Sequence, residues 1–319
     1  MPKIAIVDKM HQDGINLLKN NPKFECEIIE DLSKENLISK LPNFDGITLR
    51  RGKIDAEILG KCKNLRVISR HGVGYDNIDT KILKEKKISL LVTGTTTSVS
   101  PAEHIMFMIL NISKSFNLFD KSVRDGKFDT VMHMKHESFE LFGKKMLIVG
   151  FGRIGKQLIK RCLGFEMKVF AYDPFVDKKV IEKLGGKKIN NLEEGLKEAD
   201  ILSLSVPLTK DTYNMINLEK MKKMKKTSII INTSRGGVIN ENDLNAALDK
   251  EIIYGAGLDV FEKEPPDEKN PLLKNKKVIL SPHAATFTKE CLSNMAVQTA
   301  QNIIDFFENN LKESMIVKL

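Results

Sequence analysis

The stretch "LIVGFGRIGKQLIKRC" at residues 147–162 decides the fold of this chain. Its glycines Gly150, Gly152 and Gly155 have the spacing G-x-G-x-x-G, between an apolar segment typical of a strand and an amphipathic segment typical of a helix. A strand, a glycine-rich turn and a helix in this order are typical of a unit that binds a dinucleotide. The three glycines alone would be weak support, because glycines occur in many tight turns.

The residues around these glycines strengthen the interpretation, because each has a physical task. Gly150 allows the tight turn, Gly152 lets the backbone approach a pyrophosphate, and Gly155 lets the helix pack closely on the strand. The helix N-terminus presents free N–H groups to the phosphates. Asp173 ends the next expected strand, "KVFAYD", where its carboxylate would accept hydrogen bonds from ribose hydroxyls and repel a 2′-phosphate. We therefore expect a Rossmann unit that binds NAD rather than NADP.

This glycine fingerprint lies in the middle of the chain because a complete α/β module precedes it. Short β-branched segments alternate with amphipathic segments on both sides of it, which predicts parallel sheets covered by helices. The strands expected before it are 3–8, 26–30, 46–50, 65–71 and 88–93, and those expected from it onward are 145–150, 168–173, 200–206, 228–234, 253–260 and 278–283. The chain therefore reads as two doubly wound modules, with the nucleotide module inserted before the C-terminal helix of the first.

Two helices outside this alternation are expected to connect the modules. The long apolar segment 100–119 is predicted to form one helix, with Pro101 in its first turn. A last helix is expected at roughly 288–310, and its "NIIDFF" is expected to pack back on the first module. A chain of 319 residues is long for one domain, which agrees with two.

The bulk properties exclude several classes of protein. No apolar run reaches the ~18 residues of a membrane helix and no signal-peptide pattern opens the sequence, so we expect a cytoplasmic protein. The four cysteines have no C-x-x-C spacing, so we expect buried, reduced thiols and no metal site. The net charge is +9, but the densest basic run, "EKMKKMKK" (219–226), has no aromatic residues for stacking bases. It is interpreted as a solvated helix face, and no nucleic-acid partner is expected.

Polar side chains follow three of the later strands, where ligands bind in open α/β sheets. Arg235 follows "IIINTS", Asp259 and then Glu264 follow "IYGAGL", and His283 follows "VILSP". The guanidinium of Arg235 suits a carboxylate, which it can hold through two hydrogen bonds. His283 can give a proton to a carbonyl oxygen or take it back, and Glu264 can hold its other ring nitrogen. Together they predict a site for a 2-keto acid.

Each of these residues also has a simpler interpretation. Arg235 alone is compatible with a surface turn, Glu264 with a solvated loop, and Asp259 with either a nicotinamide contact or the cap of a turn. A single histidine is more often a satisfied polar residue than a catalyst. We interpret the remaining histidines in that way: His11, His71, His104, His133 and His136.

Seven ordered motifs together make a much more specific signal than the glycines. They are "RHGVGYDNID" (70–79), "SPAEH" (100–104), "GFGRIG" (150–155), "YDP" (172–174), "NTSRGG" (232–237), "GLDVFEKEPP" (257–266) and "SPHAATFTKE" (281–290). Over nearly its whole length the chain resembles the D-isomer-specific 2-hydroxyacid dehydrogenases. The resemblance implies a Rossmann NAD domain (100–287) inserted into a discontinuous, flavodoxin-like catalytic domain (1–99 and 288–319). It also implies a homodimer joined through the 100–146 region.

The resemblance implies roles for individual residues as well. Its catalytic set is Arg235, Glu264 and His283; its cofactor contacts are Gly150, Gly152, Arg153, Ile154, Gly155, Asp173, Val206, Thr233 and Asp259; and its substrate carboxylate is held by the backbone of Val73 and Gly74.

The substrate is the point at which the motifs diverge. "RHGVGYDNID" and "NTSRGGVINENDL" look closest to phosphoglycerate dehydrogenases, and Arg50, Arg51 and Lys53 could meet a substrate phosphate or form a solvated basic loop. "SPHAATFT" looks closer to lactate and hydroxypyruvate relatives. The Glu264–His283 pair argues against formate dehydrogenase, which resembles the family but has Gln in place of that Glu.

The sequence therefore predicts an NAD-dependent dehydrogenase of a small (R)-2-hydroxy acid, with 3-phosphoglycerate or a hydroxypyruvate or glyoxylate-type acid as substrate. Two alternatives remain. One is an NADH-sensing interaction protein that resembles the C-terminal-binding co-repressors, which can retain the same three residues. The other is an enzyme that acts on a related compound such as phosphite.

Overall fold

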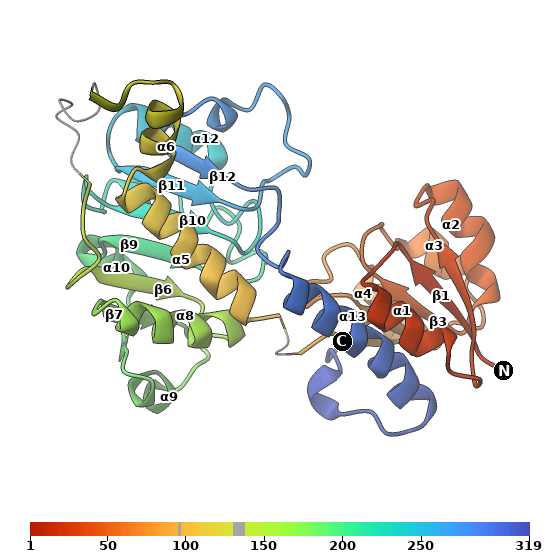
Figure 1. Ribbon diagram of the computed structural model, residues 1–319. Helices are drawn as coiled ribbons and strands as arrows, with labels where there is room; N and C mark the ends of the chain where they lie inside the picture. The colour runs from red at the N-terminus through yellow and green to blue at the C-terminus, as the bar shows by residue number, and fades with distance from the viewer. Residues whose placement is uncertain (95–96, 130–137) are drawn as a thin grey trace. The chain divides into compact units, whose positions relative to one another are not determined.

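A computed structural model describes residues 1–94, 97–129 and 138–319. The chain divides into two compact units, which are Met1–Thr97 with Thr286–Leu319 (unit 1) and Ser98–Ala285 (unit 2). Each unit has a parallel sheet with helices on its faces (Figure 1). Among the described residues, none of the helices has the length and apolarity to cross a membrane.

The sheet of unit 1 has the strand order β2-β1-β3-β4-β5, and all its neighbours are parallel. This is the flavodoxin-like order, so the expected doubly wound fold is confirmed. Its strands are β1 (Lys3–Val7), β2 (Glu25–Ile29), β3 (Gly46–Leu49), β4 (Val67–Arg70) and β5 (Ser89–Leu91).

The last long helix of the chain belongs to unit 1. The helices of this unit are α1 (Gln12–Lys19), α2 (Lys34–Lys40), α3 (Ala56–Lys61), α4 (Thr80–Lys86) and α13 (Lys289–Phe307), with short 3-10 turns at Leu41–Asn43 and Glu313–Met315. Helix α13 packs on α1, β3 and β4 and buries Ala296, Ala300 and Ile303. A Cβ atom at Gly14 would lie 2.4 Å from the carbonyl oxygen of Ala296, so only glycine permits this close crossing. The predicted return of the final helix to the first module is confirmed.

The sheet of unit 2 has the order β12-β11-β10-β9-β6-β7-β8, again with every neighbouring pair parallel. The order reverses between β6 and β9, which is the arrangement of a Rossmann fold. Its strands are β6 (Lys145–Val149), β7 (Lys168–Tyr172), β8 (Lys187–Lys188), β9 (Ile201–Leu204), β10 (Ile229–Asn232), β11 (Gly255–Leu258) and β12 (Val278–Leu280). Strand β8 has only two residues, too few for a hydrophobic pattern to predict it.

Helices cover both faces of this second sheet. They are α5 (Val99–Ser113), α6 (Phe116–Arg124), α8 (Arg153–Gly164), α9 (Lys178–Lys183), α10 (Leu192–Glu198), α11 (Leu218–Met221) and α12 (Glu241–Asp249), with a 3-10 turn at Pro271–Leu273. Helices α5 and α8 pack against each other on one face, and α10, α11 and α12 contribute to the apolar core of the other (Figure 1).

The prediction of one helix over 100–119 is wrong. Helix α5 ends at Ser113, and α6 begins at Phe116 after a turn in which Ser115 has a φ of 50°. That left-handed conformation interrupts the helical backbone, and the Ser113 hydroxyl donates a hydrogen bond back to the Leu110 carbonyl. The apolar pattern continues across this break, so periodicity alone could not reveal it.

Candidate active site

The glycine fingerprint forms the turn between β6 and α8. Gly150 has a φ of +91°, and a Cβ atom there would lie 2.4 Å from the Ser205 carbonyl oxygen. A Cβ atom at Gly155 would lie 2.7 Å from the Gly150 oxygen, so α8 packs directly against the turn. At Gly152, by contrast, a Cβ atom would meet no described atom within 4 Å. The N-terminus of α8 therefore faces open space, as a pyrophosphate site requires.

The carboxylate of Asp173 lies directly beside this turn, at the end of β7. Its Oδ2 accepts a hydrogen bond of 2.8 Å from the Phe151 N–H, and its Oδ1 accepts one of 2.9 Å from the Phe175 N–H. These bonds fix the carboxylate and leave other lone pairs for ribose hydroxyls.

Two buried hydroxyls near the fingerprint end of the sheet also fit a bound cofactor. Ser205 follows β9 and Thr233 follows β10, and neither side-chain oxygen has a hydrogen-bond partner among the described residues. Buried polar groups are usually paired, so unpaired ones at the carboxyl ends of Rossmann strands are consistent with a ligand there. The residues of unit 2 thus fit NAD through the open space at Gly152 and through these unpaired hydrogen-bonding groups.

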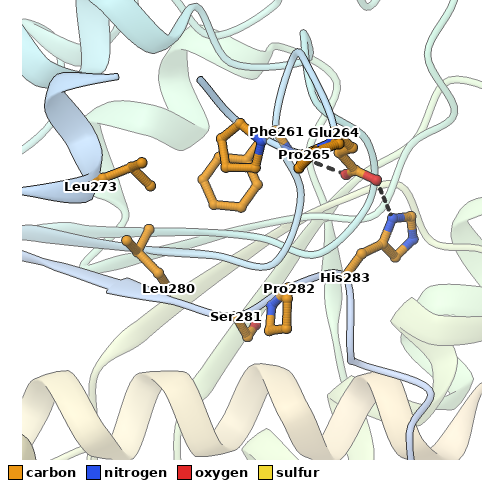
Figure 2. A pocket seen from close by; sticks show the side chains of 9 residues that line it. Phe261, Glu264, Pro265, Leu273, Leu280, Ser281, Pro282 and His283 are labelled. Carbon is orange, nitrogen blue, oxygen red and sulfur yellow. Dashed lines mark hydrogen bonds and ion pairs between the residues drawn. The ribbon is translucent and has the colours of Figure 1, made fainter. Parts of the chain in front are cut away.

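Glu264 and His283 form a hydrogen-bonded pair at the carboxyl ends of β11 and β12 (Figure 2). The distance from His283 Nδ1 to Glu264 Oε2 is 2.7 Å, and the other carboxylate oxygen accepts the Phe261 N–H at 3.2 Å. The side chains are 49% and 39% exposed, so the pair is open to a ligand. With Nδ1 engaged by the carboxylate, Nε2 is the ring nitrogen that remains for proton transfer.

Burial alone would raise the pKa of Glu264, but the hydrogen bond and the charge of His283 outweigh it and lower that pKa. The Phe261 N–H and the Arg235 guanidinium lower the pKa of Glu264 further. Glu264 therefore acts as an ionised acceptor beside the imidazole.

The loop that carries Arg235 packs against the loop that carries Glu264. A Cβ atom at Gly236 would lie 1.8 Å from the Phe261 carbonyl oxygen, so these two loops touch through their backbones. The Asn232 amide donates a hydrogen bond of 2.9 Å to the Arg235 carbonyl, and the guanidinium donates one of 2.6 Å to the Ser234 carbonyl. The structure thus brings the loops of the three expected catalytic residues into one region of unit 2.

Asp259 fixes the segment that carries His283. Its carboxylate is fully buried and accepts hydrogen bonds from the Ser281 hydroxyl (2.5 Å) and from the N–H groups of Ala284 (2.7 Å) and Ala285 (3.0 Å). Its carbonyl accepts the His283 N–H at 2.7 Å. Of the two interpretations offered for Asp259, the structure shows the cap of a turn, and its contact with nicotinamide stays a prediction.

A cavity of about 440 Å³ lies against the Glu264–His283 pair. Figure 2 shows the pair at one side of it and apolar side chains around the rest. The lining residues are Phe261, Glu264, Pro265, Pro266, Leu273, Leu280, Ser281, Pro282 and His283.

Two of the expected substrate residues of unit 1, Arg50 and Arg51, face the carboxylate of Asp8. Arg51 donates two hydrogen bonds to Asp8 (2.7 and 3.2 Å), and Arg50 Nη1 lies 3.6 Å from the same carboxylate. Burial alone would raise the pKa of Asp8, but Arg51 and then Arg50 outweigh it and lower that pKa. Val73 is exposed and Gly74 is half-buried, on the loop after β4.

The histidines expected to be satisfied polar residues differ in their environments. His11 caps α1 by accepting the Asp13 N–H, and His104 bonds to the Ser281 hydroxyl at 2.9 Å. The interpretation is wrong for His71, which is buried and whose Nε2 has no partner among the described residues. His133 and His136 lie outside the described residues.

Sequence reasoning missed two participants in the site, Ser281 and the connection of His104 to Asp259. His104 lies on α5, far along the chain from the β11 and β12 loops, so no local spacing relates these residues. Among the residues that the structure describes, no group of three or more His, Cys, Asp or Glu side chains could hold a metal ion.

Comparison with known proteins agrees with the motifs. Residues 106–285 match the family model for the D-isomer specific 2-hydroxyacid dehydrogenase, NAD binding domain. The D-3-phosphoglycerate dehydrogenase of Methanocaldococcus jannaschii is 36% identical over 99% of this chain and 59% of its own length. The glyoxylate reductase of Korarchaeum cryptofilum is 34% identical over 99% of this chain and 96% of its own length.

A solved structure shows the same fold in a ligand complex. The D-lactate dehydrogenase of Aquifex aeolicus, complexed with NAD and lactic acid, matches with a TM-score of 0.88 and 28% identity over 98% of each chain. This chain spans a little over half of the phosphoglycerate dehydrogenase but nearly all of the glyoxylate reductase. The match to the NAD-binding domain over more than half of the chain shows that this protein, whose cofactor is NAD, belongs to the D-isomer-specific 2-hydroxyacid dehydrogenase family.

Proposed function

We propose that this protein is an NAD-dependent dehydrogenase that interconverts a small (R)-2-hydroxy acid and its 2-keto acid. The observation that carries the proposal is the 2.7 Å hydrogen bond between His283 and Glu264, in the same unit as the glycine fingerprint. A partly exposed imidazole oriented by a carboxylate is a general acid–base arrangement. NAD, when bound, supplies the acceptor or donor of hydride.

In this proposal the chain's own residues move the proton and hold the acid. His283 donates its Nε2 proton to the substrate carbonyl oxygen during reduction and takes it back during oxidation. Glu264 keeps Nδ1 protonated, so Nε2 always faces the substrate, and its charge stabilises the imidazolium. Arg235 holds the substrate carboxylate through its planar fork and polarises the carbonyl group. The backbone of Val73 and Gly74 in unit 1 provides further contacts to that carboxylate.

The proposed cofactor contacts follow the Rossmann pattern. Arg153 and Ile154 at the N-terminus of α8 meet the pyrophosphate, and Asp173 meets the ribose hydroxyls. The remaining contacts are the backbone near Val206, Thr233 and Asp259 together with the fingerprint glycines.

The proposed substrates are 3-phosphoglycerate and small acids of the hydroxypyruvate or glyoxylate type. The names of two relatives, a phosphoglycerate dehydrogenase and a glyoxylate reductase, support both possibilities. A phosphate on Arg50 or Arg51 would have to share that charge with Asp8, whereas the smaller acids need no such contact. Direct assay separates the two.

An apolar face of unit 2 supports a homodimer through the 100–146 region. Phe107 and Phe116 are more than half exposed beside a cavity of about 570 Å³, whose lining also includes Phe165. Exposed apolar patches of this kind mark interaction surfaces. Residues 130–137 of that region lie outside the described residues.

We propose no nucleic-acid or membrane partner and a cytoplasmic location. Lysines of the 219–226 run pair with acidic side chains, as Lys223 does with Glu193 and Lys225 does with Asp200 at 2.7 Å. This pairing reduces the charge available to phosphates. The four cysteines are free thiols, as in a reducing compartment, and burial raises the pKa of the Cys162 thiol to about 12.

The test is NADH oxidation with a panel of phosphohydroxypyruvate, hydroxypyruvate, glyoxylate, pyruvate and branched 2-keto acids. We expect catalytic turnover with at least one acid and weaker turnover with NADPH, because Asp173 repels the 2′-phosphate. Tight NADH binding without turnover of any acid would contradict the proposal and favour the NADH-sensing interaction protein.

A further inference from the structure

A chain of hydrogen bonds runs from helix α5 to the segment that carries His283. His104 Nε2 lies 2.9 Å from the Ser281 hydroxyl oxygen, which lies 2.5 Å from Asp259 Oδ1. A hydroxyl has one proton, and a carboxylate can only accept, so Ser281 donates to Asp259. The Ser281 oxygen then accepts from His104, which places the His104 proton on Nε2.

The other end of this chain is the backbone of His283 itself. His283 has a φ of 54°, a left-handed conformation that is uncommon for non-glycine residues and that its surroundings hold here. Asp259 provides that support, because its carbonyl accepts the His283 N–H and its carboxylate accepts the next two N–H groups. Asp259 therefore holds the backbone of residues 283–285, from which the His283 side chain projects.

Ser281 and His104 in turn hold the Asp259 carboxylate. The Ser281 hydroxyl is the side-chain donor to Oδ1, and His104 Nε2 is also 3.7 Å from the same oxygen. The His104 side chain is only 18% exposed, and its ring lies 5.9 Å from that of Phe107 on the same helix. The hydrogen-bond chain is thus anchored on an element that packs against β10, β11 and β12.

We propose that His104 and Ser281 are positioning residues that orient His283 through Asp259. The proposal rests on the function proposed above, because it requires His283 to be the proton donor. Neither residue touches the reacting atoms. A displacement of a catalytic group by about 1 Å can cost about a hundredfold in rate. Partial loosening of the His283 segment should therefore lower kcat about tenfold without weakening the binding of NADH.

The test uses Ser281→Ala and His104→Phe, which remove the hydroxyl and the ring nitrogen while keeping most of the volume. We expect each to lower kcat about tenfold, with the KM of the keto acid and the Kd of NADH within about twofold of wild type. The double variant should lose no more than one single variant, because both act through one chain. His104→Gln keeps an N–H donor and should recover most of the activity.

Ser228→Ala is the matched control for a structural effect. The Ser228 hydroxyl also lies in unit 2, is more deeply buried than that of Ser281, and donates a 2.8 Å hydrogen bond to the Ala199 carbonyl, but it lies at the amino end of β10. We expect this variant to lower Tm at least as much as Ser281→Ala does and to leave kcat unchanged. Active sites are counted by NADH titration, so misfolded protein does not affect the comparison.

The His283→Ala background distinguishes the two proposals. If positioning acts through His283, Ser281→Ala should cause no further loss of kcat in that background. A kcat within twofold of wild type for both Ser281→Ala and His104→Phe, or a loss that persists without His283, would overturn the positioning role. Wild-type turnover by His283→Ala alone would overturn the proposed function instead.

Discussion

His71 and His283 occupy equivalent positions in the two units, just beyond the carboxyl end of a parallel strand, yet their environments are opposite. His71 is 6% exposed, has Arg50 and Arg70 nearby, and has no partner for Nε2 among the described residues. His283 has a half-exposed side chain, and Glu264 holds its Nδ1. The topology delivers both histidines to a functional edge, but burial and neighbouring charge decide what each can do.

The pKa of His71 shows how strong this control is. Burial, with smaller contributions from the charges of Arg50 and Arg70, lowers the pKa of His71 to about 3. The ring therefore stays neutral at physiological pH and cannot serve as a proton donor there. A histidine next to a strand end is thus a catalytic candidate only when a carboxylate orients it and a ligand can reach it.

Of the changes that test this comparison, removal of the His283 ring should have the largest effect on kcat. We expect His283→Ala to lower kcat by about 10²–10⁴-fold, because general acid–base catalysis contributes that much. The Kd of NADH should stay within about twofold, since Asp173 and the fingerprint are untouched. Steady-state kinetics and NADH fluorescence titration measure the two quantities. Turnover close to that of wild type would remove His283 from the mechanism.

Arg235 should rank next. We expect Arg235→Ala to lower kcat/KM by about a hundredfold, through loss of the fork that holds the substrate carboxylate. Arg235→Lys keeps the charge but not the planar fork, so it should have a kcat/KM between those of Arg235→Ala and wild type. Keto-acid titrations at saturating NADH make the comparison. An unchanged kcat/KM in Arg235→Ala would exclude the residue from the site.

A smaller effect is expected at Glu264. The Glu264→Gln variant keeps the shape but loses the charge that stabilises the imidazolium, and we expect kcat to fall about tenfold. Because the pKa of Glu264 is lowered, its carboxylate is ionised at every pH above the ordinary pKa of a glutamate. The negative charge is lost only when the pH falls below that ordinary value. Because Glu264 is ionised over this whole range in wild type, the deficit of Glu264→Gln should be present at every pH from 6 to 8. A deficit that disappears within this range would show that Glu264 itself titrates there.

The smallest effect on turnover is expected at His71, where the comparison predicts a pH-dependent difference in stability instead. The pKa of His71 is lowered in the folded state. The unfolded chain therefore binds a proton at His71 below about pH 6.5, whereas the folded chain binds it only below about pH 3. Wild type should lose stability relative to His71→Leu as pH falls through this window, by up to about 1.4 kcal/mol per pH unit. Urea unfolding at pH 7 and pH 5 measures the difference. A constant difference would show that His71 is not held neutral.

The sequence predicted the fold through its alternation of strands and helices, and it predicted the hydrogen bond between Glu264 and His283 from the positions of these residues beyond two strands. Strand lengths were overestimated at the carboxyl ends: the segment expected at 253–260 is a strand only over Gly255–Leu258. Asp259 is buried like the strand residues before it, but its carboxylate accepts hydrogen bonds from the next loop and caps a turn. Buried residues just beyond a strand are therefore easily counted as part of the strand when only the sequence is known.

The features that the sequence could not reveal depend on contacts between distant segments. The break at Ser115 comes from one left-handed residue inside an apolar run. The bond between His104 and Ser281 joins a helix to a loop at the far end of the sheet order, and the pairing of Asp8 with Arg51 joins two strand ends. No local spacing encodes such pairs, because the topology alone brings them together.

Chemical rescue of His283→Ala by imidazole tests the central claim most directly. The account holds that an imidazole nitrogen at this position carries the substrate proton, and the half-exposed side chain leaves room for a free imidazole to replace it. We predict that imidazole restores NADH oxidation by the variant with saturable dependence on its concentration, and that it leaves the wild-type rate unchanged. Wild-type turnover by His283→Ala without imidazole would contradict the account.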